Sequence, residues 1–329
     1  MKNQRRYPTI QNAEETIIRH CQDKKLELYG DAADEWVAGR LKQELKAICE
    51  NGNAVAFLAA KNLTDRARAA GHLSGITGTL GSSLTAFLLG ITGINPLCPH
   101  YRCEKCKHVE LVPDAASGFD LPTKLCPKCG EMMTGDGHDI PFDSFGGQNG
   151  EKIPEISLIF TSEITAKGRE LLQEIFPEDI IVRAGHLHKT KSNAEKFGLH
   201  PGGWFVIPVQ YKDDVKIVTF DELPVTAQDY RELTDRYLKL DILSYDDLDN
   251  LYKLSSEMGV QLEKIPMNDP NALAPHRFSD LWIKEFPKSQ AVCRAIIDVQ
   301  LMWFKLNHPE EYTRVCAKST APNSCPLDV

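Results

Sequence analysis

The sequence predicts an α+β protein into which a small zinc ribbon is inserted. Helical periodicity dominates residues 31–70, whereas short apolar runs separated by turns dominate the chain beyond Pro141. Two Cys-x-x-Cys pairs lie between these two regions. A helical part and a strand-rich part within one chain are typical of the α+β class.

The first predicted helix covers residues 31–49. Apolar residues recur in it at steps of three and four, as one buried helix face requires: Val37, Leu41, Leu45 and Ile48. We expect Lys42, Glu44 and Lys46 to lie on the solvent side of this helix. A second helix is predicted over residues 54–70.

The remaining elements are predicted from runs and turns. Four apolar runs predict strands, at residues 156–160, 180–182, 204–209 and 215–220. Helices are expected over residues 164–175, over most of 226–256 with an interruption near 240–245, and over about 288–306. A stretch rich in Pro, Asn and Asp at residues 266–275 predicts a linker.

The two cysteine pairs are the most informative local feature. Nineteen residues separate Cys103 and Cys106 from Cys126 and Cys129. Each pair can present two thiolates from one tight turn, and two such turns together form the tetrahedral sulfur shell that zinc prefers. Four sulfur ligands leave no open coordination position. The spacing therefore predicts a structural zinc ion, with four reduced, unliganded cysteines as the alternative.

Composition and net charge exclude some classes of protein. The net charge of −8 argues against a protein that coats nucleic acid by charge alone, although a local basic groove is compatible with it. Modest cysteine content together with a zinc motif fits a reducing cytoplasm. No apolar run follows residues 1–6, so we expect no signal peptide. The longest apolar stretch, residues 84–94, contains two glycines and is too short to cross a membrane.

A glycine- and hydroxyl-rich tract is the best candidate for binding phosphate. It includes Gly78, Gly81, Ser82 and Ser83, and an apolar segment that can begin a helix follows it. Glycines allow backbone N–H groups to converge on an anion, and a helix N-terminus adds a favourable dipole. The tract lacks the lysine of a P-loop, so a flexible glycine turn is an equal interpretation.

Two further residues are candidate site residues because of their local sequence context. His200 opens the compact turn His-Pro-Gly-Gly just before a predicted strand. Asp241 lies in the apolar frame of residues 238–243, where a strand-like segment would present one acid. A two-metal site would need further carboxylates nearby, and the pattern offers none in an obvious place.

Read together, these segments resemble the PolC-type alpha subunit of bacterial DNA polymerase III. The resemblance covers nearly the whole chain and keeps one order. It includes GTLGSS at 78–83, NPL at 95–97, PHY at 99–101, the four cysteines, GFDLP at 118–122, DGHDIPF at 136–142, RAG at 183–185, HPGG at 200–203, LKLDIL at 238–243, FPK at 286–288 and WFK at 303–305.

The resemblance implies a polymerase palm, a mixed sheet with flanking helices, in a DNA-dependent DNA polymerase. It implies three catalytic aspartates that hold two divalent ions such as Mg²⁺. In this chain Glu155 and Ser157 occupy two of these positions, and Asp241 keeps the third. The implied nucleotide- or phosphate-binding positions are Gly78, Gly81, Ser82, Ser83, His200 and Lys288. The family arginine of the glycine-serine loop is Thr77 here.

These departures lead us to expect a degenerate family member without ordinary polymerase activity. Two adjacent divalent ions need several carboxylate oxygens to offset their repulsion. Ser157 offers one neutral hydroxyl, and Glu155 displaces its oxygens by about an ångström, a shift that can cost about 100-fold in rate. Thr77 removes a cation that would neutralise a triphosphate.

The resemblance also sets the expected organisation of the chain. We expect residues 1–95 to form the N-terminal helical part of the palm with the glycine-serine loop. Residues 96–140 would form the zinc ribbon, and residues 141–265 the palm-like remainder. Residues 266–329 would form a reduced, helical fingers segment, because a long family stretch is absent between 274 and 286 and another is trimmed between 186 and 200.

Three functions remain open at this point. The first is a catalytically impaired protein that keeps the palm and zinc ribbon to bind DNA, a nucleoside triphosphate or a replication partner. The second is a working nucleotidyltransferase whose metal site is rebuilt from Glu155, Asp241 and another acid. The third is a structural module that uses its zinc ribbon to bind a protein, and this would show no affinity for DNA or nucleotides.

Overall fold

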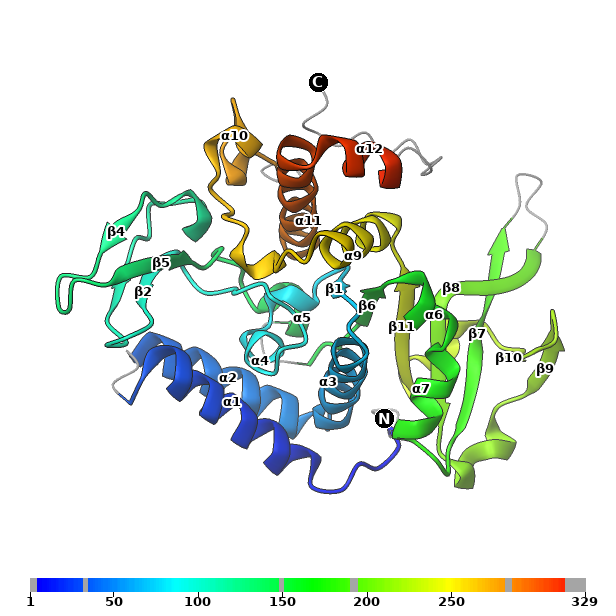
Figure 1. Ribbon diagram of the computed structural model, residues 1–329. Coiled ribbons are helices and arrows are strands. Elements are labelled where there is room, and N and C mark those ends of the chain that lie inside the picture. Colours follow the sequence, from blue (N-terminus) through cyan, green and yellow to red (C-terminus); the bar gives the residue numbers. More distant parts are fainter. Residues whose placement is uncertain (1–4, 32–34, 148–150, 190–194, 282–285, 317–329) are drawn as a thin grey trace.

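The computed structural model describes residues 5–31, 35–147, 151–189, 195–281 and 286–316. Figure 1 shows two sheets: a large one on one side of the molecule and a small one on the other, with helices between and around them. The α+β class and the mixed sheet with flanking helices are as predicted. In this part of the chain no helix has the length and apolar character that a membrane crossing requires.

Three helices precede the first strand. They are α1 (Ala13–Tyr29), α2 (Glu35–Glu50) and α3 (Ala54–Ala69). The predictions for α2 and α3 are confirmed, although α2 begins at Glu35 and residues 32–34 lie outside the described part. The sequence analysis missed α1. The expected solvent position of Glu44 is wrong, because its side chain is fully buried.

Strand β1 (Ser74–Ile76) leads into the glycine-serine tract. The tract forms the single 3-10 turn η1 (Leu80–Ser82), and Ser83 then caps the short helix α4 (Leu84–Leu88) by accepting from the N–H of Ala86. The predicted helix after the tract therefore exists, and its N-terminal N–H groups begin at the two serines.

The large sheet has seven strands in the order β1-β6-β11-β8-β7-β10-β9. Its bounds after β1 are β6 (Ile156–Phe160), β7 (Ile180–Lys189), β8 (Glu195–Ile207), β9 (Ile217–Phe220), β10 (Leu223–Thr226) and β11 (Leu238–Ser244). Strands β6 and β11 run parallel, whereas β11 and β8 run antiparallel. All four predicted strands are present, two of them longer than expected.

The mostly helical prediction for residues 226–256 is wrong in its first half. Residues 223–226 form β10, α8 (Tyr230–Leu233) is a single turn, and residues 238–244 form β11; only α9 (Asp246–Met258) is a long helix. Strand β11 lies between β6 and β8, so both of its edges are hydrogen-bonded. These pairings favour the strand over local helix propensity.

The two faces of the large sheet are covered differently. Apolar residues of β6 and β11 join the main core with α3, α6 (Ser162–Ala166) and α7 (Gly168–Ile175). The expected single helix over 164–175 is thus two helices. On the opposite face a second core gathers residues of β7 and β8 with the connection that includes η3 (Val209–Asp214) and α8: Val182, Ala184, Phe205, Ile207, Val215, Leu233 and Tyr237.

The small sheet carries the cysteines and has its own core. Its order is β3-β2-β5-β4, with β2 (His100–Cys103), β3 (Val109–Leu111), β4 (Lys124–Leu125) and β5 (Met132–Asp136). The turn η2 (Gly118–Asp120) packs directly on β5. A Cβ atom added at Gly118 would lie only 2.0 Å from the carbonyl oxygen of Asp136, so this close approach requires glycine.

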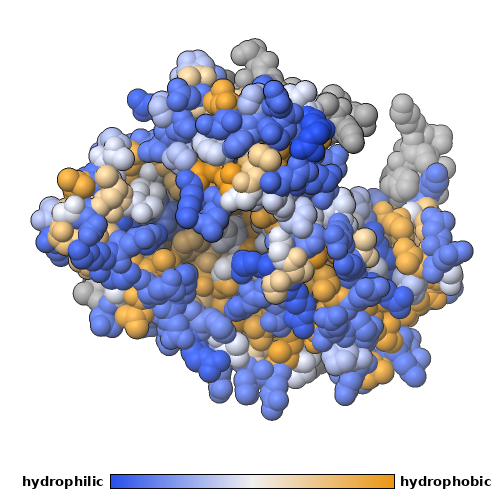
Figure 2. Space-filling view, in the orientation of Figure 1, coloured by the Kyte–Doolittle hydropathy of each residue, from blue (hydrophilic) through white to orange (hydrophobic). Residues whose placement is uncertain are grey.

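The C-terminal elements pack on the same main core. They comprise η4 (Leu262–Lys264), α10 (Pro270–Leu273), η5 (Phe278–Leu281), α11 (Lys288–Asn307) and α12 (Pro309–Cys316); α5 (Asp143–Gly146) links the two sheets. Helix α11 confirms the prediction for 288–306, and the expected linker contains α10. Figure 2 shows charged and polar side chains over most of the visible face, with apolar ones mainly near its centre and over the large sheet.

Candidate functional site

The site predicted around Asp241 lies in the middle of the large sheet. Asp241 on β11 and Ser157 on β6 are neighbours in register on adjacent parallel strands. The hydroxyl of Ser157 donates a hydrogen bond of 2.8 Å to Oδ2 of Asp241, and both residues are at least 95% buried. The structure therefore brings these two family positions together. What faces Asp241 across the strands is a hydroxyl rather than a second carboxylate.

The second oxygen of Asp241 is bound by a cation of its own strand. Nζ of Lys239 lies 2.6 Å from Oδ1 of Asp241, and both side chains are almost fully buried. Nδ1 of His200 lies 3.6 Å from the same oxygen. Burial, followed by the charge of Lys239, lowers the pKa of His200, so the neutral imidazole is favoured at neutral pH. A divalent ion at Asp241 would have to displace or share this ammonium contact.

Glycines allow His200 to approach β11. Gly203 is the register partner of Asp241, and a Cβ atom added there would lie 2.6 Å from Nδ1 of His200. Gly202 has a φ of +66° and would place a Cβ atom 2.7 Å from the carbonyl oxygen of Ile242. The compact turn expected at residues 200–203 is wrong, because these residues lie within β8; their glycines instead allow the imidazole to lie beside the acid.

Glu155 does not complete a carboxylate site. It lies just before β6 and its side chain is exposed to solvent. Within the described ranges the one group of three or more Cys, His, Asp or Glu ligands close enough to share a metal ion is that of the four cysteines. Glu155 and Asp241 therefore belong to no such cluster.

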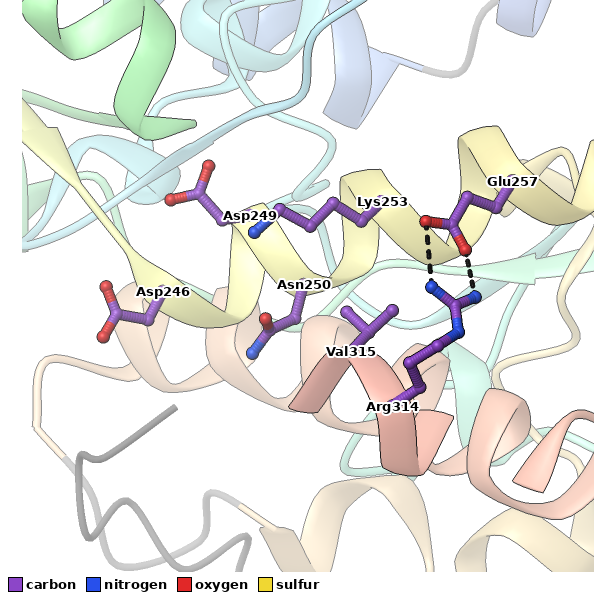
Figure 3. Close-up of a pocket in the computed structure, with 7 residues that line it drawn as sticks. All are labelled: Asp246, Asp249, Asn250, Lys253, Glu257, Arg314 and Val315. Atoms are coloured by element: carbon purple, nitrogen blue, oxygen red, sulfur yellow. Dashed lines mark hydrogen bonds and ion pairs between the residues drawn. The ribbon is translucent and has the colours of Figure 1, made fainter. Parts of the chain in front are cut away.

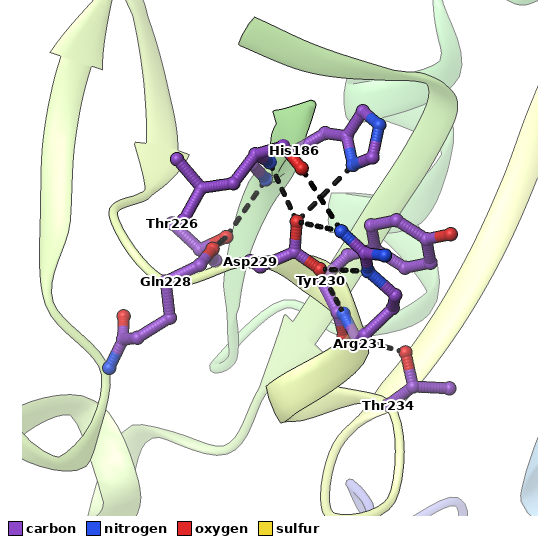
Figure 4. A network of polar contacts seen from close by, with 9 residues as sticks. His186, Thr226, Gln228, Asp229, Tyr230, Arg231 and Thr234 are labelled. Carbon is purple, nitrogen blue, oxygen red and sulfur yellow. Dashed lines mark hydrogen bonds and ion pairs between the residues drawn. The ribbon is translucent and has the colours of Figure 1, made fainter. Parts of the chain in front are cut away.

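A polar network that the sequence analysis missed borders this site (Figure 4). Asp229 is buried and accepts from the backbone N–H of Leu187 (2.6 Å) and of Arg231 (3.0 Å), and from the Arg231 guanidinium. Nδ1 of His186 lies 3.2 Å from Oδ2 of Asp229. Burial alone would raise the pKa of Asp229, but these hydrogen bonds hold it well below its ordinary value.

The network places an aromatic ring over the site. Asp229 caps α8, whose first residue is Tyr230. The Tyr230 ring centroid lies 4.3 Å from that of His200 and 5.4 Å from Nζ of Lys239. A carboxylate at the start of a one-turn helix thus fixes the ring that covers Lys239. The only sequence signal was Asp229 at a position that could cap a helix.

The glycine-serine loop makes its hydrogen bonds within the protein. The Glu44 carboxylate of α2 accepts from the Ser83 hydroxyl (2.8 Å) and from the N–H groups of Leu84 and Thr85 (3.0 Å each). Nε of Arg40 donates to the same carboxylate at 2.6 Å. The anion at the N-terminus of α4 is therefore an internal side chain. Ser82 is also fully buried, and Gly81 is packed against neighbouring side chains.

Helix α11 contacts the other end of the loop. Oε1 of Gln290 accepts from the Thr77 hydroxyl (2.7 Å) and from the N–H of Gly78 (2.8 Å). Nζ of Lys288 donates to the carbonyl of Asp139 at 3.1 Å, and burial lowers its pKa. The N–H of Thr77 also donates to the carbonyl of Ser157. The loop thus contacts the start of α11 through Gln290 and strand β6 through the carbonyl of Ser157.

The four cysteines converge as predicted. Sγ of Cys103 and Sγ of Cys129 lie 3.5 Å apart, as do those of Cys106 and Cys126. All four sulfur atoms lie within 4.8 Å of one another. A zinc ion with Zn–S bonds of about 2.3 Å holds its sulfurs about 3.8 Å apart. The donor set and its spacing therefore fit one tetrahedral zinc ion.

Comparisons with known proteins identify the family to which the chain is related. Residues 15–196 match the family model described as the bacterial DNA polymerase III alpha NTPase domain. The chain is similar to DNA polymerase III PolC-type of Thermotoga maritima (35% identity, 81% of this chain, 22% of the relative) and of Lactococcus lactis (36%, 80% and 19%). It is also similar to that of Bacillus subtilis (34%, 81% and 21%).

The chain spans about a fifth of the length of these relatives. The family model covers more than half of the chain, from the helical part through the cysteine module to β7. The resemblance seen in the sequence is confirmed: the chain belongs to the bacterial DNA polymerase III alpha family and is similar to its PolC-type members.

Proposed function

We propose that this chain binds DNA through a palm-like sheet and does not join nucleotides to it. The observation that carries the proposal is the pairing of Asp241 with the hydroxyl of Ser157, at the place where the family resemblance implies a second carboxylate. One buried carboxylate, already bound to Lys239, is a poor site for two divalent ions.

The charges at the site support loss of catalysis. Mg²⁺ prefers near-octahedral oxygen coordination, and two ions in a phosphoryl-transfer site repel each other strongly unless carboxylates lie between them. Ser157 contributes no charge, and the carboxylate of Glu155 is exposed before the strand begins. We infer that Mg²⁺ binds weakly here and that Lys239 provides the positive charge beside Asp241.

The glycine-serine loop supports DNA over a nucleoside triphosphate as the bound species. The hydroxyl of Ser83 and the N–H of Gly78, which would bind phosphate, are hydrogen-bonded to Glu44 and Gln290. A triphosphate would meet the Glu44 carboxylate at the start of α4. DNA does not require a phosphate-binding loop of this kind, because side chains spread over a protein surface bind its backbone.

The zinc ribbon has a structural role in this proposal. The module has a small core of its own, and two of the four cysteines are buried in it: Cys103 and Cys126. Zinc would supply the cross-link that such a small core lacks, and with four thiolate ligands it offers no position for a substrate.

The proposal is tested with a fluorescein-labelled primer–template duplex and the full chain. We expect binding by fluorescence anisotropy with a dissociation constant on the order of micromolar at low salt, weakening as salt rises. We expect no primer extension with Mg²⁺ or Mn²⁺ and all four deoxynucleoside triphosphates. Extension would show a rebuilt metal site, and absence of DNA binding would favour a module that binds a protein partner.

A further inference from the structure

A polar pocket lies between α9 and α12, away from Asp241. Its volume is about 410 Å³. Figure 3 shows side chains of α9 along one wall, with Arg314 and Val315 of α12 opposite them. None of the predicted site residues lines it, so a ligand bound here would be independent of the proposed DNA binding.

The buried amide of Asn250 is the feature that points to a ligand. Asn250 is only 7% exposed and lines the pocket, and Figure 3 shows its side chain between the two helices. Within the described part of the chain its amide makes no hydrogen bond, and its polar atoms are not sealed off from the pocket. An amide offers two donor hydrogens and an acceptor oxygen, and a ligand that covered them without pairing them would incur a desolvation cost. A ligand that supplies both an acceptor and a donor would remove this cost.

Charges alternate along the same wall. Asp246 and Asp249 lie at the start of α9, and Lys253 follows one turn later. At the far end Glu257 forms an ion pair with Arg314. Asp249 also accepts from the N–H of Ser162 at 2.9 Å, which fixes its carboxylate at the rim. A ligand here meets negative charge first and positive charge about 6 Å further along the helix.

The length of the pocket and the spacing of its charges fit an extended peptide. The wall from Asp246 to Glu257 is about 16 Å long, which an extended segment of about five residues spans. Three carboxylates against two cations disfavour a nucleic-acid backbone. A peptide group carries the N–H and C=O that complement a side-chain amide, and alternate residues of an extended segment lie about 6.6 Å apart, which matches the charge spacing.

We propose that this groove binds an extended segment of a partner protein. The backbone of that segment pairs with the Asn250 amide. A Lys or Arg side chain of the segment contacts Asp246 and Asp249, and an Asp or Glu two residues away contacts Lys253. Val315 provides the apolar wall against which the segment packs.

The test uses the full chain and three fluorescein-labelled, end-blocked peptides. Two carry both charges in the two directions, GAKAEAG and GAEAKAG, and the third, GAQAQAG, is uncharged. We expect one charged peptide to bind at least about tenfold more tightly than GAQAQAG by fluorescence anisotropy. Equal or absent binding of all three overturns the proposal.

Substitutions then locate the site. Asn250→Leu should weaken binding of the better peptide about tenfold while the melting temperature stays the same or rises, because a side chain of similar size replaces an unpaired amide. A lower melting temperature, or unchanged affinity, would mean that Asn250 serves the fold alone.

A charge reversal gives a second, independent readout. Lys253→Glu should weaken binding about fivefold, and GAKAKAG should restore it by placing a lysine opposite the new carboxylate. Lys264→Glu makes the same change at an exposed position outside the groove and should leave affinity unchanged. Equal effects of the two variants, or no restoration by GAKAKAG, would contradict the proposal.

Discussion

The clearest quantitative prediction concerns the buried Glu44. Its two carboxylate oxygens accept four hydrogen bonds, from Arg40, Ser83, Leu84 and Thr85. Glu44→Gln keeps the shape of the side chain but turns one oxygen into an NH₂ group, so two of these four bonds are lost. A hydrogen bond to a charged group is worth about 1.5 kcal/mol or more, which gives a loss of about 3 kcal/mol.

The assay is urea unfolding followed by circular dichroism, with the free energy of unfolding obtained by linear extrapolation. Glu50→Gln on the same helix is the matched control, because Glu50 lies 3.9 Å from Lys46 and both side chains are about two-thirds exposed. We expect this exposed pair to change stability by less than about 0.5 kcal/mol. If Glu44→Gln were as mild as Glu50→Gln, the reasoning about the internal anion at α4 would be refuted.

Three further changes test other parts of the fold. Cys103→Ser should release zinc, measured by metal analysis of the purified protein, and unfold the small sheet; a protein that contains no zinc to begin with would contradict the assignment. Gly118→Ala should destabilise by at least about 2 kcal/mol because its Cβ meets the Asp136 backbone, whereas Gly39→Ala in open space on α2 should stabilise by about 0.5 kcal/mol. Asp229→Asn should cost about 2 kcal/mol at pH 7. The pKa of Asp229 is depressed in the folded protein, so its carboxylate stabilises the fold above the ordinary pKa near 4, and this stabilisation is lost as the pH falls below that value. The difference in unfolding free energy between variant and wild type should therefore shrink in acid. A difference that is constant with pH would mean that the carboxylate is unpaired.

Local patterns predicted the elements that depend on local information. Cysteine spacing located the four-sulfur cluster, because each Cys-x-x-Cys turn fixes two sulfurs locally. The periodicity of Val37, Leu41 and Ile48 located the buried face of α2. Strand β6 was found because all of its residues are apolar or small and buried on both faces.

Features that depend on distant partners were not predictable in the same way. Glu44 fits a solvent-facing position by its type, yet the N–H groups of α4, forty residues later, draw it into the core. The strand-like frame of residues 238–243 predicted an interruption of a helical region, but not the pairing with β6 and β8 that makes this segment a central strand. The role of Asp229 depends on Leu187 from another strand. The division into four structural units stays a prediction.

The central claim is that the replacement of two family aspartates by Glu155 and Ser157, rather than a disrupted palm, prevents polymerisation. It is tested most directly by primer extension with Mg²⁺ and Mn²⁺, comparing the natural chain with Glu155→Asp/Ser157→Asp. We predict no extension by the natural chain and measurable extension by the double variant, whose new carboxylate at position 157 would face Asp241 across β6 and β11. Extension by the natural chain would contradict the claim.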